Sequence, residues 1–204
     1  MPKIKNRSWI HRHLNDPYVK KAQRLGYASR AAFKLLGIQE KDKLFKPGMT
    51  VIDLGSTPGG WSQVARKYVG QSGKVIAIDL LPMDGVPDVI FILGDFNDHI
   101  ILDQLNTELN GEKADVIISD MAPNLSGQRS IDLPRTIHLL ELALDCVEKN
   151  LKPGGTFLFK AFHGAGLEEF LQRVKTHFKQ VKYRKPEASR SESTEIYILA
   201  MGFR

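Results

Sequence analysis

Cysteine is nearly absent from this sequence, which has only Cys146 among its 204 residues. A single cysteine excludes an intrachain disulfide framework and is typical of proteins in a reducing compartment. The apolar run of about 18 residues that a membrane helix needs is also missing. No apolar segment follows the basic start, as it would in a secretory signal. We therefore expect a cytoplasmic protein with no membrane contact, long enough to bury a core of its own.

The sequence also lacks the common signatures of metal and phosphate sites. The six histidines do not show metal-ligand spacing, so we predict no metal. The glycine turn reads Gly55-x-x-x-Gly59-Gly60, which is not the G-x-G-x-x-G pattern of dinucleotide sites. No Gly-Lys-Ser/Thr follows it, so a phosphate-binding loop is not indicated either. A nicotinamide oxidoreductase is therefore disfavoured.

Acidic residues are scarce in residues 1–34, where nine Lys/Arg face only Asp16. A second basic cluster, residues 173–190, has seven Lys/Arg against Glu187. One isolated charge run is usually a solvated surface. Two such runs, the first with interleaved aromatic residues, favour contact with the phosphate backbone of a nucleic acid.

The apolar pattern predicts an α/β fold. Residues 1–28 show no helical or strand periodicity and are interpreted as a basic N-terminal arm, followed by a single domain over 29–204 whose first helix begins at a Ser29 cap. Strands are expected at 50–54, 74–79, 89–93, 115–119, 155–160, 180–185 and 195–203, with helices at 60–69, 98–109, 135–151 and 167–178. This alternation predicts a Rossmann-like, mostly parallel seven-stranded sheet with helices on both faces. Only nine residues separate the last two strands, so these should form a hairpin, with the final strand antiparallel.

Acidic residues lie at or just after four predicted strand ends: Asp53, Asp79, Asp95 and Asp120. Ligands of such sheets bind beyond the carboxyl ends of the strands. Carboxylates would repel a phosphate but suit S-adenosylmethionine, which has a positive sulfonium and no phosphate. In this interpretation Asp79 accepts from ribose hydroxyls and Asp95 lies near the adenine amino group. Each aspartate taken singly is more simply a helix cap or turn residue.

Two glycine-turn residues complete the predicted cofactor site. Gly59 would let the backbone approach the ligand, and Trp61 could pack beside it.

Three ionisable residues should meet at this same edge of the sheet. Lys160 ends an apolar strand, Asp120 follows another, and Glu195 begins the antiparallel one. A lysine that ends a buried strand is unusual, because an unpaired buried ammonium is costly. The alternative is a side chain that reaches solvent. Lys34 belongs to the first predicted helix, whose position the residues alone do not fix.

This combination resembles the FtsJ/RlmE family of ribose 2′-O-methyltransferases that act on large-subunit ribosomal RNA. The similarity runs from Ser29 to the C-terminus and is carried by SRAAFKL, DLGSTPGGWSQVA, GKVIAIDLLPM, GDF, DVIISDMAPNLSG, LKPGGTFLFKAF and KPEASRSESTEIYILA. The resemblance implies a catalytic tetrad at Lys34, Asp120, Lys160 and Glu195. It also implies S-adenosylmethionine contacts at Gly59, Trp61, Asp79, Asp95 and Asp120. Ser56 and Thr57 stand where relatives commonly have two alanines, a small change.

The resemblance further implies attack by a uridine 2′-hydroxyl of the 23S ribosomal RNA, in the assembled large subunit, on the methyl group of the cofactor. A lysine normally carries a proton at neutral pH, so the residues leave open whether Lys160 accepts the hydroxyl proton or only orients the hydroxyl. Residues 1–34 and 173–190 would contact the RNA, and nothing demands an oligomer. The open alternatives are the same chemistry on transfer RNA or a messenger RNA cap, a small-molecule methyltransferase, and a non-catalytic RNA-binding module.

Overall fold

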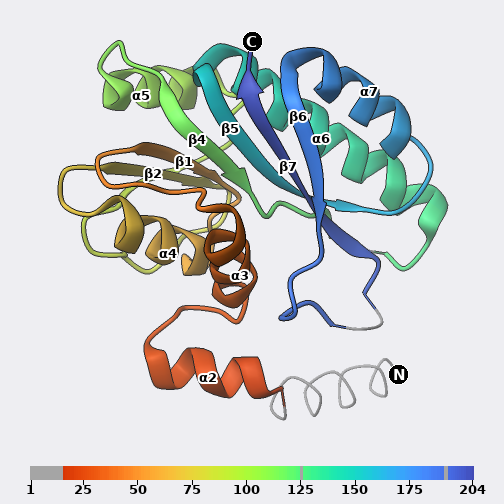
Figure 1. Ribbon diagram of the computed structural model, residues 1–204, viewed down its shortest axis with the longest axis horizontal. Coiled ribbons are helices and arrows are strands. Elements are labelled where there is room, and N and C mark those ends of the chain that lie inside the picture. Colours follow the sequence, from red (N-terminus) through yellow and green to blue (C-terminus); the bar gives the residue numbers. More distant parts are fainter. Residues whose placement is uncertain (1–15, 125, 191–192) are drawn as a thin grey trace.

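The computed structural model describes residues 16–124, 126–190 and 193–204, arranged as one sheet with helices on both faces (Figure 1). Residues 1–15, the first part of the predicted arm, lie outside the described residues. The helices are α2 (Pro17–Leu25), α3 (Ala32–Asp42), α4 (Gly60–Val69), α5 (His99–Leu109), α6 (Arg129–Asn150) and α7 (Leu167–His177). The strands are β1 (Thr50–Leu54), β2 (Lys74–Asp79), β3 (Ile90–Leu93), β4 (Ala114–Ser119), β5 (Leu151–Phe162), β6 (Phe178–Arg184) and β7 (Glu195–Phe203). None of the described helices is long and apolar enough to cross a bilayer.

The seven strands form one sheet in the order β3-β2-β1-β4-β5-β7-β6. Strands β1 to β5 pair in parallel, whereas β7 is antiparallel to both β5 and β6. The predicted Rossmann-like sheet, its final antiparallel strand and its hairpin are confirmed. The return of the chain inserts β7 between β5 and β6, so the start of β7 lies beside the end of β5.

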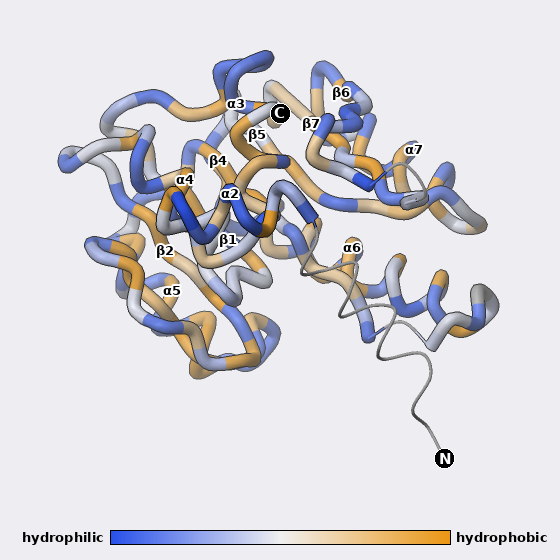
Figure 2. The backbone as a smooth tube through the Cα atoms, turned by 90° about the horizontal axis from the view of Figure 1, so that it is seen from below, coloured by the Kyte–Doolittle hydropathy of each residue, from blue (hydrophilic) through white to orange (hydrophobic). Residues whose placement is uncertain are grey.

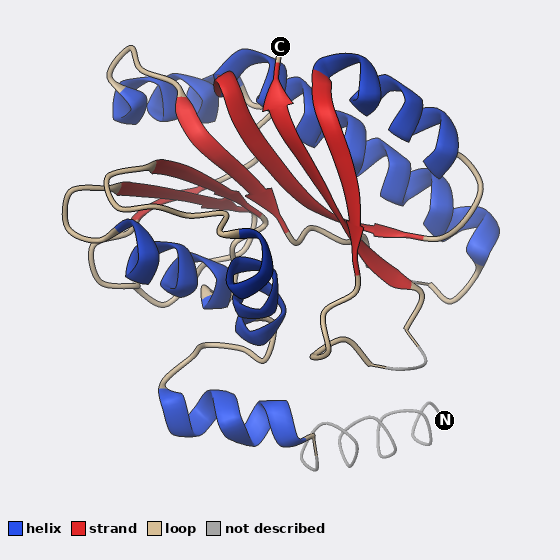
Figure 3. Ribbon diagram, viewed as in Figure 1, coloured by secondary structure: helices blue, strands red, loops and turns tan. Residues whose placement is uncertain are grey.

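Both faces of the sheet are buried, each under its own helices. Figure 3 shows the helices on the two sides of the strands, and Figure 2 shows hydrophobic colour along the central strands. Helices α3 and α4 cover one face, with core residues such as Leu35 and Val64. Helices α5, α6 and α7 cover the other, with Leu105, Leu144 and Phe170. Continuous apolar strands were therefore the correct signal for a sheet covered on both sides.

The arm prediction is wrong for helix α2. Asp16 caps this helix by accepting a hydrogen bond from the Tyr18 N–H at 3.0 Å, Pro17 occupies its first position, and Gly26 ends it with φ of 73°. These are standard start and stop residues of a helix. The signal was present, but nine residues are too few for an obvious apolar period.

Several predicted boundaries also shift, most of all the start of α6, which lies at residue 129 rather than 135. Helix α3 begins at Ala32, because Ser29 to Ala31 form a turn in which the Ser29 hydroxyl accepts from the Ala31 N–H at 3.3 Å. Strand β5 runs from Leu151 to Phe162, so Lys160 lies two residues before its end.

Gly55 turns the chain sharply after β1. Its φ is 74°, and a Cβ built there would lie 2.4 Å from Cγ of Met121, the second residue after β4. A side chain at this position would therefore meet both backbone strain and a steric clash.

We expect Gly55→Ala to destabilise the fold more than Gly111→Ala. Gly111 has a similar φ of 77°, but its Cβ would meet nothing within 4 Å. The Gly111 variant should lose about 1–2 kcal/mol of unfolding free energy, because alanine is strained in the left-handed backbone conformation. The Gly55 variant should lose about 1–3 kcal/mol more, because its new methyl group overpacks the turn. Urea unfolding of both variants measures the difference. Equal losses would show that the turn does not depend on this close approach.

Candidate active site

A cavity of about 620 Å³ opens at the carboxyl ends of β1, β2, β3 and β4. Its wall includes Gly55 and Thr57 of the glycine turn and the predicted residues Asp79, Asp95 and Asp120. The structure thus brings together three aspartates that lie far apart in the sequence. Helix α6 closes one side with residues that sequence reasoning missed, among them Arg135 and His138.

Asp79 and Asp95 are held by backbone amides as well as facing the cavity. Asp79 accepts from the Thr57 N–H at 2.9 Å and from the Leu81 N–H at 2.8 Å. Asp95 accepts from the backbone and side-chain N–H groups of Asn97 at 3.0 and 2.9 Å. Each carboxylate therefore acts as a turn residue, as the simpler interpretation held. Carboxylate oxygens have about four acceptor sites in all, so these bonds fix the group without saturating it.

Neither Gly59 nor Trp61 of the glycine turn is among the residues that line the cavity. The Trp61 side chain is 3% exposed and packs in the core, where its Nε1–H donates to the Ala31 carbonyl at 3.0 Å. Any contact of Trp61 with a ligand must come from its backbone N–H, in the first turn of α4. Gly59 has φ of 105°, and a Cβ there would lie 2.9 Å from Val86. The close approach of the loop after β2 is therefore enough to require a glycine at position 59.

The four tetrad residues form two ion pairs at the end of the sheet. Lys34 Nζ lies 2.6 Å from Glu195 Oε1, and Lys160 Nζ lies 3.1 Å from Asp120 Oδ1. Lys160 also donates to the backbone carbonyl of Asp120. Lys160 and Glu195 are each only 9% exposed. The alternative, a Lys160 side chain that reaches solvent, is therefore not observed. Lys34, which the sequence could not place, joins the other three residues.

Tyr197 connects the two ion pairs, and sequence reasoning missed it. Its hydroxyl donates to Asp120 Oδ1 at 3.0 Å, while Lys34 Nζ lies 5.7 Å from the centre of its ring. Lys160 and Tyr197 are direct partners across β5 and β7. Its place two residues after Glu195, on the same side of a strand, was the available signal.

Burial and charge act together on the pKa values here. Burial raises the pKa of Tyr197 well above its usual value, and the neighbouring Asp120 charge adds to this, so its hydroxyl keeps the proton that it donates. Burial alone would also raise the pKa of Glu195, but the Lys34 ammonium outweighs it and the pKa is lowered. Glu195 is therefore ionised at neutral pH.

Asp53 is a further buried carboxyl close to this site. It is fully buried; Oδ2 accepts from the Ser62 hydroxyl at 2.6 Å, and Oδ1 has no partner among the described residues. Burial raises the pKa of Asp53 to about 7, and the charges of Asp120 and Asp79 act in the same direction. Asp53 is the fourth aspartate that the sequence placed at a strand end, but it does not line the cavity as the other three do.

The segment after Asp120 forms part of the cavity rim, where Ala122 to Asn124 line the cavity. Further on, Asp132 of α6 accepts from the Ser126 and Gly127 N–H groups at 2.8 and 3.0 Å, and the Ser126 bond is the main cause of its lowered pKa. This loop is thus anchored to the helix that closes the cavity. Across the described parts of the chain, no group of three His, Cys, Asp or Glu side chains is arranged to hold a metal ion.

Comparison with known proteins agrees with this geometry. The FtsJ-like methyltransferase family matches residues 27–203. The chain belongs to the FtsJ-like methyltransferase family. It is therefore a methyltransferase, and its tetrad lies inside the matched region.

Curated relatives of this FtsJ-like methyltransferase carry the name ribosomal RNA large subunit methyltransferase E. The protein from Coxiella burnetii is 56% identical over 203 residues, covering 97% of this chain and 95% of the relative. The one from Acinetobacter baumannii is 54% identical over 197 residues, covering 97% and 91%. A crystal structure from Plasmodium falciparum, provisionally assigned as a ribosomal RNA methyltransferase, superposes with a TM-score of 0.76 at 29% identity and covers 87% of this chain and 98% of its own.

Asp53→Asn should make stability less dependent on pH. The pKa of Asp53 is raised to about 7 in the folded state and lies near 4 in the unfolded state. The protonated carboxyl therefore stabilises the folded state fully below about pH 4, and this stabilisation is lost as pH rises through about 7. The unfolding free energy of the variant relative to wild type should therefore rise by on the order of 2 kcal/mol between about pH 5 and pH 8. Urea titrations at both pH values measure this. Asp103→Asn, an exposed change on α5, should show no such trend; a pH-independent Asp53 difference would contradict the raised pKa.

Proposed function

We propose that this protein transfers a methyl group from S-adenosylmethionine to the 2′-hydroxyl of a uridine in large-subunit (23S) ribosomal RNA. The observation that carries the proposal is the convergence of Lys34, Glu195, Lys160 and Asp120 at the edge of the aspartate-lined cavity. The names of the close relatives support the RNA substrate. They make transfer RNA or a messenger RNA cap less favourable candidates.

The cavity fits the proposed cofactor by size and donor chemistry. Its volume of about 620 Å³ is in the range of pockets for nucleoside-sized ligands. Asp79, Asp95 and Asp120 offer acceptors for hydroxyl and amino groups, and the one arginine on the wall, Arg135, belongs to α6 rather than to the glycine turn. S-adenosylmethionine supplies an activated methyl group on a positive sulfonium, and the cluster of carboxylates would favour that charge.

The tetrad is arranged to hold and deprotonate a hydroxyl. Asp120 fixes Lys160 twice, through a carboxylate oxygen and its backbone carbonyl, while Tyr197 holds the same carboxylate oxygen. An ammonium held in this way would orient the ribose hydroxyl or, after losing its own proton, accept the hydroxyl proton. Lys34 and Glu195 form an ion pair beside Lys160. This pair would help to position the hydroxyl without adding net charge to the site. Positioned proton transfer typically contributes about 10²–10⁴-fold in rate.

The RNA would approach from the side of α2 and α3. The structure divides the second basic cluster: Arg173 pairs with Glu141 and Lys175 with Glu168 on α7, across the sheet from α2 (Figure 1). Residues 182–190 lie beside α2 instead, where Arg190 contacts Asp16 at 3.4 Å. The proposed RNA surface is therefore narrowed to residues 1–34 and 182–190. Monomeric action in the cytoplasm, on an assembled large subunit, remains part of the proposal.

The substrate is tested with labelled methyl donor and three acceptors: unmodified large subunits, naked ribosomal RNA and transfer RNA. Mapping the product identifies the nucleotide and shows whether the methyl group is on ribose or base. Label on a base, or only on transfer RNA, would overturn the proposal.

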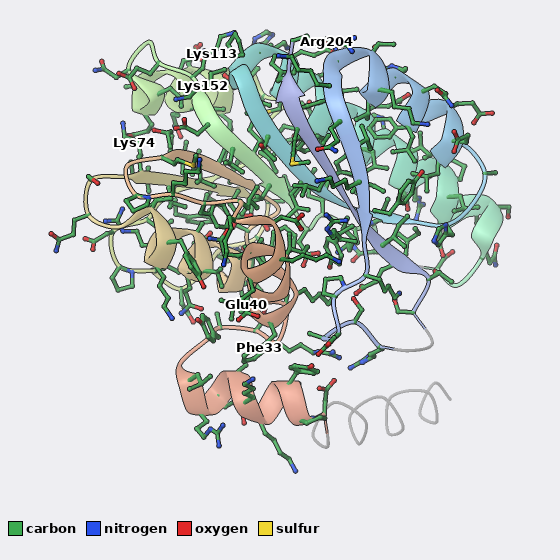
Figure 4. The ribbon with its side chains drawn as sticks, in the orientation of Figure 1. Phe33, Glu40, Lys74, Lys113, Lys152 and Arg204 are labelled. Atoms are coloured by element: carbon green, nitrogen blue, oxygen red, sulfur yellow. The ribbon has the colours of Figure 1, made fainter. Side chains whose placement is uncertain are left out.

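Lys160→Ala should reduce methyl transfer to large subunits by at least about a hundredfold, because the hydroxyl loses its positioned partner. Affinity for S-adenosylmethionine should stay within a few-fold of wild type, since Lys160 does not line the cavity. Lys113→Ala is the control, an exposed lysine at the end of the molecule opposite α2 (Figure 4). Single-turnover rates and calorimetry separate the two effects. Wild-type turnover in the Lys160 variant would remove the assigned role.

Asp79→Asn should weaken S-adenosylmethionine binding about tenfold, because the amide removes the negative charge and its NH2 group cannot accept one of the two backbone N–H bonds that Asp79 accepts. Isothermal calorimetry measures the affinity, with Asp103→Asn as the matched control outside the cavity. Unchanged affinity for Asp79→Asn would mean that this aspartate serves the loop alone.

A further inference from the structure

A second groove lies apart from the cofactor cavity, between α2, α3, the end of α4 and the segment after β6. Its volume is about 650 Å³. Its lining combines aromatic residues with five basic and two acidic residues: Lys21, Lys41, Lys67, Arg184 and Lys185 against Glu40 and Glu187. Lys67 and Tyr68 come from α4, which neither basic cluster of the sequence includes. The groove is therefore a surface created by the fold.

Aromatic packing fixes the floor of the groove. The Phe33 ring lies 5.5 Å from the Tyr18 ring and 5.7 Å from the Tyr27 ring, and Lys21 Nζ lies 4.8 Å from its centre. Figure 4 shows Phe33 on the side of α3 that faces α2, with Glu40 further along α3. These contacts hold α2 against the domain and so keep the groove in shape.

Tyr183 is the exposed aromatic residue of the groove. It belongs to the edge strand β6, between Lys182 and Arg184, and is 49% exposed. Arg184 is paired with Asp42, but Lys21, Lys41 and Lys67 also line the groove. A half-exposed ring in a groove lined by lysines matches the arrangement with which proteins hold single-stranded nucleic acids, where bases stack on aromatic faces and lysines contact phosphates. A duplex keeps its bases stacked inside and could use only the charges.

The groove is adjacent to the tetrad. Lys185 lines the groove and donates to the carbonyls of Ser193 and Glu195, at 2.6 Å each. On α3, Phe33 of the groove floor directly precedes Lys34 of the tetrad in the sequence. A chain that leaves the catalytic lysines across α3 would therefore enter this groove.

We propose that the groove binds the single-stranded RNA segment next to the target nucleotide, with one base stacked on Tyr183 and a phosphate near Lys67. This inference rests on the proposed methylation of ribosomal RNA and adds where the RNA flanking the target is held. The excess of basic over acidic residues favours an anionic occupant. The half-exposed Tyr183 ring favours RNA over an acidic protein segment, because a base can stack on it.

The test measures methylation of unmodified large subunits by Tyr183→Ala and Lys67→Glu. Both variants should raise KM for the subunits about tenfold or more, because a base–aromatic stack and a phosphate contact are lost. The rate at saturating subunits and the S-adenosylmethionine affinity should stay at wild-type values. Tyr183→Phe keeps the ring and should behave as wild type, as should Lys113→Glu, an exposed charge reversal at the far end of the molecule.

A second measurement identifies the occupant. Photo-crosslinking from p-benzoylphenylalanine at position 183, on bound subunits, should attach ribosomal RNA within a few nucleotides of the methylated ribose. Crosslinks to a ribosomal protein alone would overturn the inference, as would unchanged KM values in both groove variants or equal defects in Tyr183→Ala and Tyr183→Phe. These outcomes leave the methylation proposal intact, because that proposal is tested separately by whether wild-type protein methylates a ribose of the subunits.

Discussion

The buried ion pair between Lys160 and Asp120 is the constraint on which the site depends. Lys160 is 9% exposed and projects from a strand in the middle of the sheet, where an unpaired ammonium would be strongly unfavourable. The Asp120 carboxylate and carbonyl and the Tyr197 hydroxyl form the network that compensates this burial. Such a network tolerates little displacement, because any lost partner leaves a charge without compensation. The same rigidity holds a lysine ready to meet a hydroxyl group.

The cavity and the groove differ in charge. The cavity is lined by Asp79, Asp95 and Asp120 and suits a cationic donor. The groove is lined by lysines and aromatic rings and suits an anionic chain. Lys34 stands between them, paired with Glu195. The arrangement keeps the two substrates apart except at the tetrad, where the transfer is proposed to occur.

Helix α2 is an integral part of this arrangement. Asp16 caps α2 and also accepts from Arg30 and Arg190, while Arg30 donates to the Ala188 carbonyl. These bonds tie the start of α2 to the segment that leads into β7 and Glu195. RNA held along α2 would thus lie on a surface already coupled to the tetrad.

The sequence by itself determined the order of strands and helices, the parallel sheet and the convergence of Asp120, Lys160 and Glu195. Apolar runs report burial, and the carboxyl ends of parallel strands must share one edge, so these features follow from local pattern. Only the tertiary structure decided where Lys34 and Trp61 lie, that α2 docks beside Arg190, and that α7 faces away from it. These depend on contacts between segments up to 174 residues apart, which no local periodicity encodes.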